Sequence, residues 1–115
     1  MNLDNLLRQR ADIWRSAEQL PAARPVVTTG SEVLDTQLAG GWPRGAITEI
    51  LCDDGAGALA VLMPALAVLS RQNRWLVLVA PPHIPYAPGF AGYGLELSRL
   101  LLVQPETGQE RLWAL

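Results

Sequence analysis

The stretch from residue 46 to residue 69 constrains the fold most, because it combines a strand-like run, a glycine-bearing loop and a helix-like run in direct succession. Residues 46–52 are mainly apolar and predict a strand, which the loop at 52–57 follows. The next run has apolar residues at helical spacing, namely Leu59, Leu62, Met63, Leu66 and Leu69. Pro64 interrupts it, and a proline inside a helix costs roughly 3 kcal/mol. We therefore expect this helix either to kink or to begin late, near Met63, with Pro64 in its first turn, and we favour the late start.

Further along the chain, the alternation of strands and helices continues. Residues 75–80 form an apolar run that predicts a buried central strand of a parallel sheet, with Trp75 in the core. Residues 86–93 predict a short helix, residues 100–103 a third strand, and residues 107–110 a capping box that opens another helix. This order is typical of an α/β fold. Because the chain stops soon after that helix begins, we expect a fragment or a shortened member of something longer.

The sequence predicts two units, an N-terminal helix with its linker and a domain that follows them. Residues 3–18 have the periodicity of an amphipathic helix and residues 21–25 form a proline-bearing linker, so residues 1–25 are expected to precede an α/β domain at 26–115. The apolar face of the helix can pack on that domain, the favoured interpretation, or dock on a partner. At the start of the domain, residues 26–28 predict a short strand and residues 31–38 a helix capped by Thr29 or Ser31.

The loop at 52–59 has the layout of a phosphate-binding P-loop without its chemistry. That motif requires Gly-x-x-x-x-Gly-Lys-Ser/Thr, in which the lysine contacts phosphates and the hydroxyl holds Mg²⁺. Here Gly57 is the second glycine, but Cys52, Ala58 and Leu59 take the first glycine, lysine and hydroxyl positions. All nine basic residues are arginines, so no lysine elsewhere can substitute. We expect no bound cofactor and no enzymatic activity, and the loop to be a connecting turn.

Composition and charge exclude several other classes of function. The net charge is −2, and a duplex-binding domain usually carries a basic stripe, so strong direct nucleic-acid binding is not expected. Cys52 is the single cysteine; it fits a reducing cytosol and is expected to be a buried small residue. A signal sequence and a membrane-length apolar stretch are both missing, which predicts a cytoplasmic protein without membrane contact. His83 has no metal-ligating neighbours, and Asp35 is expected to be a solvated helix residue.

Tryptophan and arginine residues are the candidates for partner binding, because these types often anchor protein interfaces. Trp42 and Arg44 share the glycine-rich turn at 40–45. A second group comprises Arg71, Arg74 and Arg99. For Arg71 and Arg74 the alternative is a structural one, since cations stabilise the C-terminal end of a helix.

Two stretches of the chain carry a resemblance to known proteins. Residues 27–31, 34–35 and 40–50 together resemble the run that precedes the Walker A loop in RecA recombinases. Residues 74–88 and 94–100 are similar to the SulA/ImuA family of bacterial SOS-response proteins. The resemblance covers roughly residues 26–115. It implies a RecA-like α/β fold, a parallel sheet flanked by helices that can be a truncated half of the RecA core, with a degenerate P-loop.

Within this resemblance two functions stay open. ImuA-like proteins are accessory factors of translesion DNA synthesis, whose partners are ImuB, an error-prone polymerase subunit and RecA. SulA-like proteins inhibit cell division by binding FtsZ; they resemble residues 60–104, which points to Arg71, Arg74, Trp75, Tyr86 and Arg99. The lead-in at 27–50 favours ImuA. Self-association into a homo-oligomer is compatible with both. A third hypothesis, an ATP-dependent recombinase, conflicts with the missing lysine.

Overall fold

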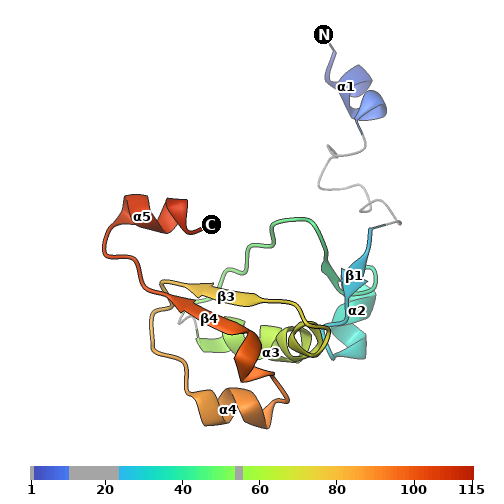
Figure 1. Ribbon diagram of the computed structural model, residues 1–115. Helices are drawn as coiled ribbons and strands as arrows, with labels where there is room; N and C mark the ends of the chain where they lie inside the picture. The colour runs from blue at the N-terminus through green and yellow to red at the C-terminus, as the bar shows by residue number, and fades with distance from the viewer. Residues whose placement is uncertain (1, 11–23, 54–55) are drawn as a thin grey trace.

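The computed structural model describes residues 2–10, 24–53 and 56–115 (Figure 1). The elements in chain order are α1 (Leu3–Gln9), β1 (Val26–Val27), α2 (Glu32–Gln37), β2 (Trp42–Pro43), α3 (Ala56–Arg71), β3 (Leu76–Val79), α4 (Ala87–Gly92), the 3₁₀ turn η1 (Leu97–Arg99), β4 (Leu100–Val103) and α5 (Gly108–Trp113).

A parallel pair of strands and two helices form the centre of the fold. β3 pairs with β4 in a register that runs from Leu76 opposite Leu100 to Val79 opposite Val103, and α4 lies in the connection between them. In Figure 1, α3 and α4 lie on the same side of this sheet. Their contact with it forms the core, which consists of Met63, Ala67, Leu76, Phe90 and Leu95. The predicted α/β class with a parallel sheet is therefore confirmed.

The opposite face of the sheet is open in the part of the chain that the structure describes. Val77 and Leu101 are register partners, and each is 48% exposed. Trp75, the residue before β3, is 56% exposed. The predictions of a buried central strand and of a core position for Trp75 are therefore wrong. The physical reason is that β3 has β4 as its strand neighbour and helices on one face, so half of its side chains lack a covering layer.

The strand predicted at 46–52 does not form. Residues 46–52 are irregular, Ile47 is 100% exposed, and Cys52 is exposed rather than buried. Strand propensity depends on packing against neighbouring strands, and a lone extended segment has no ladder partner for its N–H and C=O groups. Among the described residues β3 pairs with β4 and not with this segment, so the apolar composition alone does not produce a strand.

Helix α3 begins earlier than predicted. It starts at Ala56, directly after the loop, and continues through Pro64 to Arg71. Met63, Ala65 and Ala67 are buried around the proline. Burial of such side chains offsets the roughly 3 kcal/mol cost of an interior proline, and tertiary packing overrides local propensity. The prediction of a late start near Met63 is therefore wrong.

Antiparallel strands β1 and β2 form a short ribbon that precedes α3 in the chain. Val26 pairs with Pro43 and Val27 with Trp42, so the predicted turn at 40–45 contains a strand that the sequence did not indicate. Between them lies α2, which Ser31 caps through a 3.4 Å bond from the Leu34 N–H. The capping box predicted at 107–110 is confirmed at the start of α5.

Helix α1 lies apart from the other elements (Figure 1). Leu3 on its predicted apolar face is 58% exposed, so packing of the described helix on the domain is not observed. The helix ends at Gln9, and residues 11–18 of the predicted helix lie outside the described residues.

Candidate functional site

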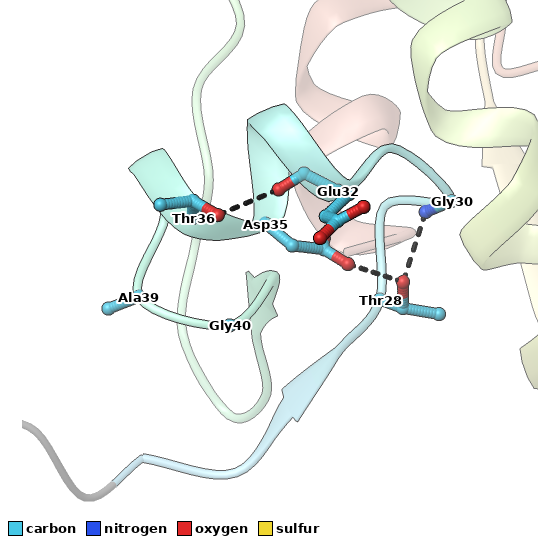
Figure 2. Close-up of a pocket in the computed structure, with 7 residues that line it drawn as sticks. All are labelled: Thr28, Gly30, Glu32, Asp35, Thr36, Ala39 and Gly40. Atoms are coloured by element: carbon cyan, nitrogen blue, oxygen red, sulfur yellow. Dashed lines mark hydrogen bonds between the residues drawn. The ribbon is translucent and has the colours of Figure 1, made fainter.

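A hydrogen-bonded cluster fixes the turn between β1 and α2 (Figure 2). The Thr28 hydroxyl donates to Asp35 Oδ2 at 2.6 Å, and the Thr29 N–H donates to Asp35 Oδ1 at 2.7 Å. These two bonds favour the ionised carboxylate and lower the pKa of Asp35, the Thr28 bond contributing most. The Gly30 N–H in turn donates to the Thr28 hydroxyl at 3.1 Å.

This cluster borders an open hollow of about 620 Å³ lined by Thr28, Glu32, Asp35 and Thr36 among others. Asp35 is a helix residue open to solvent at this hollow, as predicted, and both of its carboxylate oxygens also accept hydrogen bonds that hold the turn. Its partners lie six and seven residues away across a turn. The only sequence signal was the presence of side chains that commonly cap turns.

The ribbon of β1 and β2 packs beside α3 and leaves an apolar groove between them. The groove has a volume of about 390 Å³, and its apolar lining includes Val27, Leu62, Leu66 and Leu69. Trp42, Arg44 and Arg74 also line it. The fold thus brings three residues predicted to bind a partner to one surface, although Trp42 and Arg74 are 32 positions apart in the sequence (74 − 42).

Backbone geometry at Gly41 makes this ribbon possible. Gly41 has φ of +141°, and a Cβ atom there would lie against the Val27 carbonyl oxygen and 2.8 Å from the Val27 carbonyl carbon. Only glycine occupies that region of backbone conformation without strain. The ribbon is held further by the Arg44 N–H, which donates to the Pro25 carbonyl at 2.8 Å. Close backbone approach therefore sets the position of Trp42 in the groove.

The polar groups of the groove are only partly satisfied within the described chain. Arg44 Nη2 donates to the neutral Gln72 Oε1 at 2.9 Å, so its positive charge is oriented but not neutralised. The Arg74 guanidinium has no hydrogen-bond acceptor among the described side chains. The Trp42 indole N–H is buried and has no acceptor there either. A buried unpaired donor costs about 1–3 kcal/mol, which is a reason to look for a ligand that supplies an acceptor.

The remaining predicted partner-binding residues lie elsewhere. The Arg99 guanidinium lies over the Trp75 ring at 5.1 Å from its centroid and donates to Asn73 Oδ1 at 3.2 Å. Arg71 Nη1 donates to the Gly94 carbonyl at 3.0 Å, which ties the end of α3 to the turn after α4. These contacts give Arg71 and Arg99 structural roles, and partner binding by either residue stays a prediction.

Tyr86 lies in a third place, at an apolar hollow of about 240 Å³ between α3 and α4. Phe90, Tyr93 and Met63 also line that hollow. Tyr86 itself is largely exposed. The structure therefore brings together Trp42, Arg44 and Arg74, and separates them from Tyr86 and from the pair of Trp75 and Arg99.

The degenerate P-loop positions lie at the start of α3. Gly57, Ala58 and Leu59 belong to its first turn, and Leu59 packs against the core. An apolar side chain thus faces the interior at the position where the motif requires a magnesium-binding hydroxyl. No group of three or more potential metal ligands occurs in residues 2–10, 24–53 and 56–115. No helix in these same ranges combines the length and apolar character needed to cross a membrane.

Comparison with known proteins places this chain in a family. The chain is 32% identical over 117 aligned positions to Protein RecA of Bacillus thuringiensis (strain Al Hakam), which covers 96% of this chain and 34% of that protein. Protein RecA of Arthrobacter sp. (strain FB24) is 31% identical over 104 positions, covering 90% of this chain and 30% of that protein. The chain thus spans about a third of the length of these curated relatives. The RecA N-terminal domain matches residues 11–114, and the chain belongs to this family.

Proposed function

We propose that this protein is a non-catalytic SOS-response accessory factor of translesion DNA synthesis, similar to ImuA, and that it acts by binding other proteins. Membership of the RecA N-terminal domain family supports a role in DNA repair. The observation that carries the proposal is the groove between the β1–β2 ribbon and α3, where Trp42, Arg44 and Arg74 meet over an apolar lining. Apolar surface combined with tryptophan and arginine is typical of interface anchors.

Absence of catalysis is part of this proposal. Nucleotide hydrolysis by a P-loop requires a cation on the phosphates and a hydroxyl on magnesium. Ala58 and Leu59 supply neither, and Leu59 is engaged in the core. The helix N-terminus at Ala56 alone does not replace those groups, and the loop that leads to it carries two aspartates, whose charge opposes an anion.

A SulA-like division inhibitor is the second candidate, and one observation favours it. Trp75, just before β3, and Arg99, just before β4, form a cation–π pair on the surface, within the region that resembles SulA. Trp75 remains more than half exposed in this pair. An exposed, pre-oriented tryptophan beside an arginine is a suitable anchor for a protein partner such as FtsZ.

A side-by-side binding assay separates the two candidates. The purified chain is titrated against ImuB, RecA and FtsZ, and the GTPase activity of FtsZ is followed in parallel. Binding to ImuB or RecA, with FtsZ activity unchanged, supports the translesion function. Binding to FtsZ with loss of its GTPase activity supports the division inhibitor instead. Binding to none of the three contradicts both.

A further inference from the structure

We propose that the groove between the β1–β2 ribbon and α3 binds an acidic, apolar peptide segment of a protein partner. The inference rests on the proposed function, because it specifies the chemistry of the partner that a protein-binding groove would take. It is argued from the lining of the groove, from its charges and from its unpaired indole N–H.

The shape and lining of the groove fit one or two large apolar side chains. Its volume is about 390 Å³, and apolar side chains from α3, including Leu62, Leu66 and Leu69, line it opposite the ribbon. None of the lining residues carries a negative charge. Apolar side chains of a partner would gain free energy by leaving water for this surface. The apolar part of the segment therefore follows from the lining.

The charge of the groove selects a carboxylate beside those apolar side chains. Arg44 is oriented by a neutral amide, that of Gln72, so its charge remains available. Arg74 lines the same groove, and its guanidinium has no hydrogen-bond acceptor in the described part of the chain. The whole chain has a net charge of −2, which makes this pair of cations a local exception. Arginine recognises carboxylates through paired hydrogen bonds, and complementary charge gives specificity.

The indole of Trp42 adds a requirement for an acceptor. The Trp42 side chain lines the groove. Its N–H is buried and has no acceptor among the described residues, so an inserted peptide would reach it only if the indole turned toward the groove. Buried polar groups in folded proteins are nearly always hydrogen-bonded. A carbonyl or carboxylate of an inserted peptide would supply the missing acceptor, which the lining of apolar and arginine side chains does not. The same donor gives a spectroscopic signal for occupancy of the site.

The test is an unbiased selection of a random decapeptide library on the 115-residue chain. We expect the selected peptides to combine Asp or Glu with large apolar residues. The best of them should bind Arg74→Glu at least about tenfold more weakly, whereas Arg111→Glu, the same charge change on exposed α5, should leave affinity unchanged. In a ¹H–¹⁵N spectrum, the indole signal of Trp42, assigned from its loss in Trp42→Phe, should shift on saturation.

Several results would overturn the inference. These are selection of basic or uncharged peptides, selection of none, equal binding by Arg74→Glu, and an indole signal of Trp42 that does not move. Self-association of the chain that Arg74→Glu abolishes would also overturn it, because a second copy would then occupy the groove. Peptide binding here without any affinity for ImuB, RecA or FtsZ would sustain the groove while refuting the proposed function. If one of these proteins binds the chain and Arg74→Glu does not weaken that binding, the proposed function is sustained and the peptide-binding role of the groove is refuted.

Discussion

Replacement of Gly41 by alanine should disrupt the ribbon that forms one wall of the groove. The backbone of Gly41 has φ of +141°, a region in which a residue with a Cβ atom is strained. The added Cβ would meet the Val27 carbonyl oxygen, lie 2.8 Å from the Val27 carbonyl carbon and 3.1 Å from Thr28 Cα. All three are backbone atoms of the adjoining segment, so no side-chain rotation can relieve the clash.

Two costs combine to give the expected magnitude. Forcing alanine into this backbone region costs about 1–3 kcal/mol. Overpacking against a neighbouring backbone costs about 1–3 kcal/mol more. The free energy of unfolding should therefore fall by about 2–6 kcal/mol, and each kcal/mol lowers the melting temperature of a domain of this size by roughly 4–8 °C. We expect Tm to fall by at least about 8 °C, or the ribbon to separate from α3.

Gly57→Ala is the matched control for this prediction. Gly57 lies in the first turn of α3, its φ is not positive, and an added Cβ would meet no atom within 4 Å. Alanine in a helix gains up to about 1 kcal/mol over glycine, so this variant should melt at the same temperature as the parent or slightly higher. Both variants are compared by thermal circular dichroism. A Gly41→Ala protein that melts within about 2 °C of the parent would refute the close approach of Gly41 to Val27.

Three further predictions concern stability and nucleotide binding. Ser70→Ala should lower the free energy of unfolding in urea titrations by about 1–3 kcal/mol, because buried Ser70 accepts a hydrogen bond from the Glu96 N–H at 2.9 Å. Ser98→Ala, at an exposed serine, should change the free energy of unfolding little, and equal effects of the two substitutions would contradict this. Because the pKa of Asp35 is lowered, its carboxylate stabilises the fold fully above its ordinary value of 3.8 and progressively less as pH falls through the lowered pKa. The urea midpoint of Asp35→Asn should therefore fall less steeply with pH below about pH 4 than that of the parent. The same dependence of the midpoint on pH in both proteins would contradict this. MgATP should give no calorimetric binding heat at about 1 mM because Ala58 replaces the lysine, and a Kd below about 0.1 mM would contradict it.

Much of the local structure was predictable from short-range chemistry. The cap at Ser31, one of the two predicted candidates, and the capping box at Thr107 depend on neighbours within a few residues, and both are found in the structure. The errors arose where long-range contacts decide. Pro64 continues a helix because side chains on both sides of it are buried, and residues 46–52 remain without strand structure because pairing, not composition, makes a strand.

The groove was predictable only in part. The residue types of Trp42 and Arg44 identified one half of it, because tryptophan and arginine anchor interfaces. Arg74 was assigned to a different group, since nothing in its spacing connects it to the turn at 40–45. The close approach of Gly41 to Val27 and the position of α3 bring them together. The hydrogen bonds that Asp35 accepts were also missed, because its donors Thr28 and Thr29 lie seven and six residues away across a turn.

The affinity of ImuB for this chain, measured by calorimetry with the parent protein, Arg74→Glu and Arg111→Glu, tests the central claim most directly. The account predicts that ImuB binds the parent and Arg111→Glu equally, and Arg74→Glu at least about tenfold more weakly. Thermal unfolding of Arg74→Glu should match the parent, since no described acceptor bonds to its guanidinium. Equal binding of ImuB by all three proteins, or no binding to the parent, would contradict the account.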